Sequence, residues 1–361
     1  MLALWLGWTG LAFAKPATDP FAGIAEGEGE SAPESGDFFT DNFGFRKELM
    51  SQFGAGANNS FSSRQSVGFE VLKKFSSETS TLLSLDFQGR LVRRDGFTGS
   101  LNDMEGMDRP GWFFEYHNAY ADLYNLFGEV GRFNFRIGRF YLPFGLNLQT
   151  DTHGSILQLS NEGNFGFERD WLAGFWGSLG DLNYDAYYLA GSGYGLKFEG
   201  QGGLGAARLS LGNRALSERG LEGGASFLAG RRLSMGMAVD TVRAGLDGRW
   251  RTPALEGLVT FTTELSAGQD APTRVFTQLH QLEYLQGSRQ WGLATQFRRF
   301  WRDGAGGGSA DSSILAEGTW YFRNDVGSSN LQWVKLNVEW PLERQGGGLD
   351  AVVTLQYYQY W

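Results

Sequence analysis

Apolar and polar residues alternate along most of this chain, with a period of two. The segment 81–93 shows the pattern clearly, because its apolar residues fall on one face and its polar residues on the other. The apolar set is Leu83, Leu85, Phe87 and Leu91, and the polar set is Ser84, Asp86, Gln88 and Arg90. Side chains repeat every two residues only in a β-strand. Helical periodicity is weak by comparison, so the pattern predicts an all-β protein.

The same alternation predicts about sixteen strands, with fourteen or eighteen as the alternatives. They lie near residues 43–53, 65–75, 81–93, 112–123, 132–138, 169–179, 181–191, 203–212, 221–230, 242–251, 255–268, 274–286, 289–302, 312–323, 330–340 and 350–361. An open sheet of this size would expose long strand edges, and closure into a barrel removes them. We therefore expect one transmembrane antiparallel β-barrel over residues 43–361.

The connections between these strands differ in length, and this difference favours a barrel that crosses an outer membrane. Short connections are expected at 76–79, 180–181, 251–253 and 287–288, and long glycine-rich ones at 94–111, 142–168, 192–202 and 303–311. Outer-membrane barrels have short turns at the periplasmic end and longer loops outside. With the N-terminus in the periplasm, sixteen strands return the C-terminus to the same side.

Composition supports a barrel and excludes several other classes of protein. The chain has 53 glycines, 8 prolines and 15% aromatic residues, which suits many strands, tight turns and aromatic girdles. Its mean hydropathy of −0.29 argues against a bundle of membrane helices. Without cysteine there is no disulfide, iron–sulfur cluster or covalently attached c-type haem. A net charge of −9 makes nucleic acid a poor partner.

The two ends of the chain carry targeting signals. Residues 1–14 are an apolar run ending in Ala-Phe-Ala, which predicts a signal peptide, with a buried strand as the alternative. The run has no basic start, so translation could begin upstream. Residues 15–42 are acidic and predict a disordered periplasmic segment, or alternatively a plug or partner-binding tail. The last strand ends on Trp361, which resembles the signal read by the outer-membrane assembly machinery.

A soluble propeller or lectin-like sandwich is the main alternative fold. Such a fold needs a dry core, so the second face of its strands should lack charged residues. Here that face carries Asp86, Arg90, Arg132, Arg136, Arg243, Asp247, Arg249 and Glu264. The charges favour a water-filled lumen.

Three stretches resemble the phosphate-selective porin O/P-type family of outer-membrane porins. They are RIGRF at 136–140 leading to PFGL at 143–146, ERD at 168–170 followed by LNY at 182–184 and AGSG at 190–193, and AGLDGRW at 244–250 paired with 257–268. The resemblance implies a sixteen-stranded channel that is often a homotrimer. Phosphate selectivity in that family rests on arginines and a lysine cluster. This acidic chain has six lysines, so the selectivity is not carried over.

The residues expected to line the pore are Arg90, Glu115, His117, Arg132, Arg136, Asp151, His153, Arg243 and Arg249. A charge facing lipid near the bilayer midplane costs about 2–4 kcal/mol, so charged strand residues should point inward. The loop 142–168 could fold into the barrel and oppose Asp151 to the arginines, which would create a transverse field. Otherwise the loop packs outside and the arginines form structural salt bridges.

We expect a passive diffusion channel for small hydrophilic solutes or ions, anions among them, in the lipid of a Gram-negative-type outer membrane. It would need no cofactor, bind no metal and catalyse no reaction. One alternative is a barrel that sheathes a partner protein. Another is a hydrolase at the rim, for which His153-Gly154-Ser155 supplies a histidine and a serine. Tryptophans near strand ends predict interfacial girdles, with an aromatic track for sugars inside the lumen as the alternative.

Overall fold

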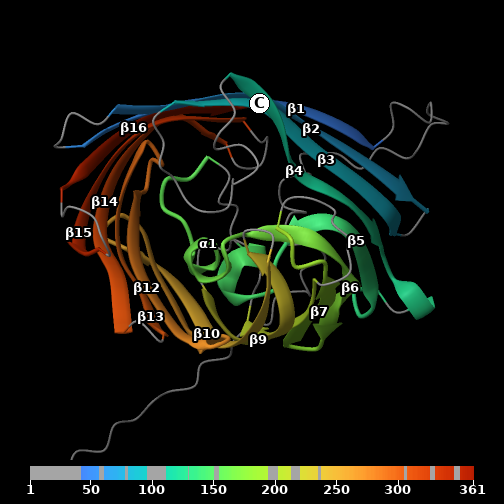
Figure 1. The fold of residues 1–361 in the computed structure, drawn as a ribbon. Coiled ribbons are helices and arrows are strands. Elements are labelled where there is room, and N and C mark those ends of the chain that lie inside the picture. Colours follow the sequence, from blue (N-terminus) through green and yellow to red (C-terminus); the bar gives the residue numbers. More distant parts are fainter. Residues whose placement is uncertain are drawn as a thin grey trace, which may run out of the picture.

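The computed structural model describes residues 42–56, 61–77, 80–95, 111–128, 130–149, 154–193, 202–212, 220–234, 237–304, 307–325, 330–344 and 350–361. Within these residues, sixteen antiparallel strands close into one barrel. Figure 1 shows the ring of strands, with β1 beside β16 where the barrel closes. The predicted fold class is therefore confirmed. The signal peptide and the acidic segment lie outside the described residues and stay predictions.

The strands are β1 (Phe43–Gly56), β2 (Phe61–Ser76), β3 (Thr81–Asp95), β4 (Trp112–Leu123), β5 (Asn134–Tyr141), β6 (Arg169–Leu179), β7 (Leu182–Leu189), β8 (Gly203–Gly212), β9 (Gly220–Ser234), β10 (Met237–Ala254), β11 (Gly257–Asp270), β12 (Thr273–Gln286), β13 (Trp291–Gly304), β14 (Gly307–Asp325), β15 (Asn330–Glu343) and β16 (Val352–Tyr360). In the described residues, three short helical segments join them: η3 (Leu126–Gly128), η4 (Gly145–Gln149) and α1 (Ser160–Phe165). Each predicted strand overlaps one of these strands.

Two predicted connections were wrong. The glycine-rich segment 303–311 is not a long loop, because β13 runs to Gly304 and β14 begins at Gly307. Glycine there extends the strands instead of ending them. Similarly, 251–253 lies within β10, and the turn follows at Leu255 and Glu256 with φ of 52° and 56°. Two positive φ angles are typical of a type I′ hairpin, whose twist matches the strands that it joins.

The two ends of the barrel are distinguished by their connections. We call the end with connections 77–80, 180–181, 255–256 and 287–290 the turn end, and both β1 and β16 have their outer termini there. The opposite end, with connections 96–111, 142–168 and 190–202, is the loop end. The loop end also has short connections at 235–236, 271–272 and 305–306. The predicted contrast in loop length therefore applies to part of the barrel.

The two faces of the wall differ as the alternation predicts. Large apolar side chains cover the outside, including Leu246 and Leu336, which are 64% and 50% exposed. Their strand neighbours Arg243, Asp247 and Asn337 are buried on the inside. A polar interior with an apolar exterior is the arrangement expected of a barrel in lipid.

One sector of the interior is apolar instead of polar. Buried side chains of β5 to β9 pack against residues of the connection 142–168 and form one cluster: Phe140, Tyr141, Leu142, Phe144, Phe165, Phe167, Leu172, Trp176, Tyr187, Leu189, Leu204, Ala206 and Leu228. We call this cluster the inner core. In Figure 1, α1 lies inside the ring of strands. None of the helices in the described residues has the length and apolar character to cross a membrane.

Candidate functional site

The connection 142–168, which we call the inner loop, folds into the barrel. It leaves β5 after Tyr141 and returns to β6 at Arg169, and the amide of Leu142 donates to the carbonyl of Glu168 at 2.9 Å to close its neck. Asn147 strengthens this neck, because its side-chain amide donates to the same carbonyl at 2.8 Å. The chain between the two strands is therefore directed inward as a closed loop.

Glu264 on β11 is the main polar anchor of the inner loop. Its carboxylate accepts hydrogen bonds from the amides of Leu146 at 2.7 Å and Ser160 at 2.9 Å. The side chain is 3% exposed, so both bonds lie away from bulk water. A carboxylate that accepts backbone N–H groups makes charge-assisted bonds, which are stronger than neutral ones. Glu264 thus holds both arms of the loop to the same strand.

Further bonds attach the inner loop to neighbouring strands. Asn164 donates to Ser266 at 2.8 Å and accepts from Nε of Arg243 at 3.0 Å. Arg232 donates to the carbonyl of Phe165 at 3.0 Å. On β13, Gln296 donates to the carbonyl of Gln158 at 3.0 Å. The inner loop is therefore attached to β9, β10, β11 and β13.

The tip of the inner loop reaches the far side of the lumen. Gly154 has a φ of +67°, and a Cβ atom there would lie 2.6 Å from the ring of Tyr358 on β16. Tyr358 stacks on Trp333 with ring centroids 4.3 Å apart. Both rings are buried, at 3% and 8% exposure, so they form the surface against which the tip of the loop packs. They offer no open aromatic face of the kind that a sugar track needs.

The inner core holds the apolar side of the same loop. The rings of Phe144 and Phe165 meet edge to face at 5.0 Å, and Phe144 lies against Gly245 of β10, where a Cβ atom would be 2.8 Å from the ring. Anchored by both charge and packing, the inner loop crosses from β5 to β16 and narrows the lumen.

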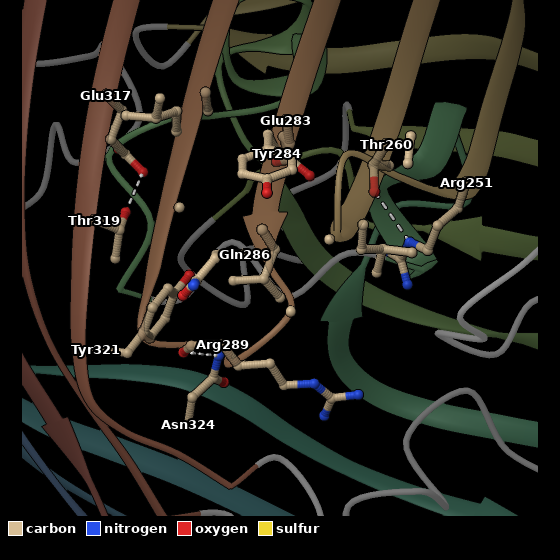
Figure 2. Close-up of a pocket in the computed structure, with 18 of the residues that line it drawn as sticks. Arg251, Thr260, Glu283, Tyr284, Gln286, Arg289, Glu317, Thr319, Tyr321 and Asn324 are labelled. Atoms are coloured by element: carbon tan, nitrogen blue, oxygen red, sulfur yellow. Dashed lines mark hydrogen bonds between the residues drawn. The ribbon is translucent and has the colours of Figure 1, made fainter.

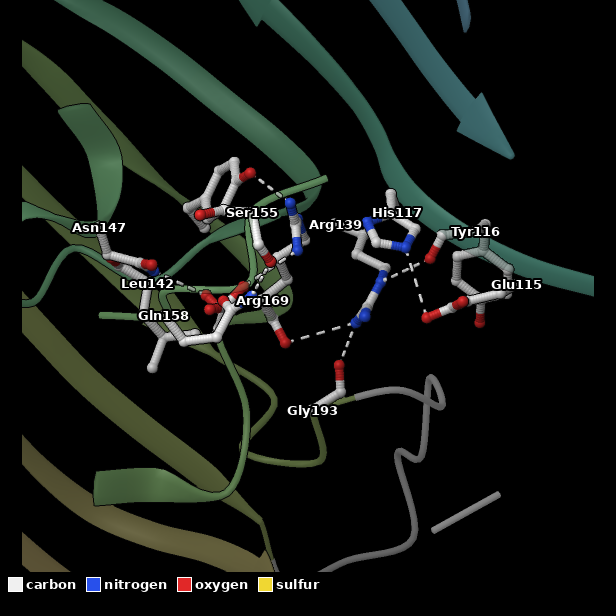
Figure 3. Close-up of polar contacts among 12 residues, drawn as sticks. Glu115, Tyr116, His117, Arg139, Leu142, Asn147, Ser155, Gln158, Arg169 and Gly193 are labelled. Carbon is white, nitrogen blue, oxygen red and sulfur yellow. Dashed lines mark hydrogen bonds and ion pairs between the residues drawn. The ribbon is translucent and has the colours of Figure 1, made fainter. Parts of the chain in front are cut away.

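The wall of β1 to β4 carries a buried charged cluster that includes three predicted pore residues. Arg90 donates through Nη2 to Nδ1 of His117 at 2.7 Å, and its Nη1 lies 3.5 Å from Glu48. A guanidinium group can only donate, so the ring proton of neutral His117 is on Nε2. That nitrogen lies 3.3 Å from Glu115. Figure 3 draws this contact as a dashed line. Arg64 and Arg94 also approach Glu115, at 3.7 and 3.6 Å.

The other predicted pore residues are dispersed. Arg136 makes two hydrogen bonds to Asp122, at 2.7 and 2.6 Å, and is enclosed by aromatic rings. Arg249 pairs with Glu222 at 3.0 Å, and Arg243 with Asp270 at 3.0 Å. Arg132 was expected on the inner face of a strand, but it is exposed in the turn before β5, because that strand begins only at Asn134. Asp151 and His153 lie outside the described residues.

Sequence reasoning missed the residues that position the inner loop. Glu264 was recognised only as one of many charges on a polar face, and Asn164 only as part of a loop. Arg139 was expected only at the rim of the barrel, because it breaks the inward register of its strand. Its guanidinium donates to the carbonyls of Tyr116 at 3.2 Å and Gly193, linking β4 to the start of the connection 190–202 (Figure 3). The sequence signal nearest to these residues was Pro143-Phe144-Gly145. It indicates where β5 ends and the inner loop begins, but not which residues hold the loop.

Between the inner loop and the turn end lies a cavity of about 750 Å³. We call it the lower chamber. Its polar lining comes from β10 to β15 and from the inner loop: Ser155, Arg251, Thr260, Glu283, Glu317, Thr319, Tyr321 and Lys335. Figure 2 shows several of these side chains around the space. No cluster of histidine, aspartate and glutamate with the geometry of a metal site occurs in the described part of the chain.

No protein-family model matches the chain, and no curated protein matches its sequence. Solved structures do match its fold. OmpF of Salmonella typhi, in complex with daunomycin, superimposes with a TM-score of 0.59 at 12% identity, covering 90% of this chain and 99% of OmpF. An anion-selective porin from Comamonas acidovorans gives 0.55 at 10% identity over 88% and 98% of the two chains.

A trimer form of OmpT, an outer-membrane protein of Vibrio cholerae, gives a TM-score of 0.52 at 10% identity over 88% of this chain and 99% of OmpT. The more specific resemblance to phosphate-selective porins stays a prediction. These likenesses, together with the closed sixteen-stranded sheet, give the chain a β-barrel fold similar to that of outer-membrane porins.

Proposed function

We propose that this protein is a passive diffusion channel for small hydrophilic solutes and ions in the outer membrane of a Gram-negative-type bacterium. The observation that carries the proposal is the inner loop, which crosses the lumen and is anchored on both of its arms. A structural sheath has no need to narrow its own lumen. A diffusion pore does, because a constriction sets the size limit and brings charged walls close to the solute.

We further propose that the loop-end entrance favours anions. On β9 to β14, Arg232 and Arg243 pair with Asp270 at 2.7 and 3.0 Å, and the guanidinium of Arg302 interacts electrostatically with Asp270 and Asp311. On β1 to β4, the three guanidinium groups of Arg64, Arg90 and Arg94 share Glu48 and Glu115. In each cluster the positive charges outnumber the negative ones by one. Charged clefts with low-dielectric walls concentrate ions of the opposite sign.

A homotrimer in the outer membrane is the assembly that we propose. Its support is the resemblance stated from sequence and the trimer form of the OmpT structure. Folding through the outer-membrane assembly machinery, by way of the last strand ending at Trp361, belongs to the same proposal. Solutes and lipid are then the remaining partners.

Planar-bilayer recording of the purified protein under a salt gradient tests the channel proposal. Stepwise conductance is expected, with a reversal potential of the sign for anion preference. An intact, heat-modifiable barrel that gives no steps would overturn the diffusion-pore proposal and favour a sheath. Conductance steps with cation preference would support the pore but overturn the proposal that the loop-end entrance favours anions.

The rim-hydrolase alternative has no geometric support. Ser155 lies on the inner loop inside the barrel, and its hydroxyl donates to the carbonyl of Leu157 at 2.8 Å. A lipid substrate would have to enter the lumen to meet it. His153 lies outside the described residues.

A further inference from the structure

The lower chamber has an arrangement of charges that the constriction does not explain. A single row of paired inward-facing residues crosses five strands: Arg251 on β10, Thr260 on β11, Glu283 on β12, Ala294 on β13 and Glu317 on β14. Adjacent strands lie about 4.8 Å apart, so Glu283 and Glu317 are roughly 10 Å apart along the wall. Alanine between them leaves open space beside both carboxylates.

The two carboxylates are incompletely paired. Lys335 lies 3.0 Å from Oε1 of Glu317, and the Oε2 atom of Glu317 is buried with no hydrogen bond. Glu283 accepts a bond from the side-chain amide of Gln281. Arg251 and Lys335 lie near enough to act on its charge, but among the described residues neither forms an ion pair with it. Glu317 is 6% exposed, so its charge is held away from bulk water. A buried carboxylate oxygen without a donor is costly unless something supplies one.

We propose that the lower chamber is a binding subsite for a primary ammonium group. An ammonium group is compact and carries three N–H donors, so it can bond to both Glu283 and Glu317 in the space beside Ala294. Two kinds of solute present this group: simple amine cations and zwitterionic amino acids. On β10, the guanidinium of Arg251 is held by Thr260 at 3.1 Å and lines the same cavity, so it can meet the carboxylate of a zwitterion.

The subsite deepens the proposed channel function and rests on it. An entrance that favours anions and a chamber that favours ammonium groups act in series. A solute with both charges is accommodated at each, whereas an ion of one sign meets one unfavourable segment. The chamber is therefore a second selectivity element, in addition to the constriction at the inner loop.

The test uses the full barrel in planar bilayers with potassium chloride as the carrier of current. Propylammonium is expected to reduce the current at lower concentration than tetramethylammonium, which has similar size and charge but no N–H donor. Glu283→Gln should raise the half-blocking concentration of propylammonium about tenfold, because a charge-assisted bond is lost. Glu339→Gln removes a charge from β15 outside the chamber and serves as the matched control.

The outcomes separate this inference from the channel proposal. Equal block by the two cations, or equal effects of Glu283→Gln and Glu339→Gln, would overturn the subsite while the potassium chloride current still supports a channel. No current at all would count against the channel itself. If Glu283→Gln does not assemble, the comparison of propylammonium with tetramethylammonium on the unchanged protein still tests whether the chamber binds a primary ammonium group. If glycine blocks the current and its block weakens in Arg251→Gln, the solute of the subsite is a zwitterion. If propylammonium blocks and glycine does not, the solute is a simple amine.

Discussion

At the scale of single residues, the inner loop depends on Gly145. Its φ is +63°, and a Cβ atom there would lie 2.3 Å from Oε1 of Glu264. Gly145→Ala would therefore strain the backbone by about 1–2 kcal/mol and displace the carboxylate that anchors both arms. We expect a larger and noisier single-channel conductance than that of the unchanged protein.

The matched control for this prediction is Gly163→Ala on α1. A Cβ atom at Gly163 would lie 3.8 Å from the ring of Phe300, which is ordinary contact distance. Its conductance should match that of the unchanged protein. Equal conductance in both variants would show that Glu264 does not hold the loop.

A second residue-scale prediction concerns the pair of Arg136 and Asp122, whose side chains are 4% and 1% exposed. Arg136→Ala leaves a buried carboxylate without its cation, so we expect a loss of about 3–5 kcal/mol of stability. Arg136→Met combined with Asp122→Leu should cost less, because no charge is left behind. Urea unfolding followed by heat-modifiable gel mobility measures both. A double variant less stable than Arg136→Ala would contradict this account.

The sequence identified such residues only by type. Alternation placed Arg90, Arg136 and Arg243 on inner faces, which the structure bears out. Their partners could not be derived, because a partner depends on the register between strands, and Arg136 meets Asp122 only through the pairing of β4 with β5. The prediction that Arg132 lies on an inner face was wrong for a related reason. The turn 124–133 extends further along the chain than the alternation of apolar and polar residues indicates.

At the scale of strands, the period of two carried nearly all of the correct information. It located sixteen strands and failed mainly where glycine was read as a loop, as at Gly307 and Gly308. The period of two could not reveal that β5 to β9 face an apolar core inside the barrel. A strand with apolar residues on both faces has the same sequence pattern whether its inner face packs against a loop or against another sheet.

Thiol labelling tests the two faces directly, because the chain has no cysteine. In liposomes, Ala294→Cys on the inner face should react with a small membrane-impermeant maleimide. Leu336→Cys on the outer face of β15 should be protected by lipid. Detergent solubilisation followed by labelling is the control for Leu336→Cys. Protection of both positions in liposomes would mean that the lumen is closed to solutes of that size.

At the scale of the whole molecule, the proposed assembly can be measured. Cross-linking in native membranes should trap species of three subunits, and mild detergent extraction should preserve them. Trapping of monomers alone would count against the trimer and leave the single-barrel channel intact. Lipid and a neighbouring subunit both select for an apolar outer surface, so cross-linking distinguishes them where the pattern of residues does not.

The wall of the barrel is uneven in height. Strands β5 and β7 have 8 residues each, whereas β10 has 18. At about 3.3 Å per residue and about 40° of tilt, 8 residues span roughly 20 Å along the membrane normal and 18 span roughly 45 Å. A typical hydrocarbon layer is about 30 Å thick. In the outer-membrane placement that we propose, acyl chains beside β5 to β8 are compressed, so this is the side on which bilayer thickness acts most strongly on the protein.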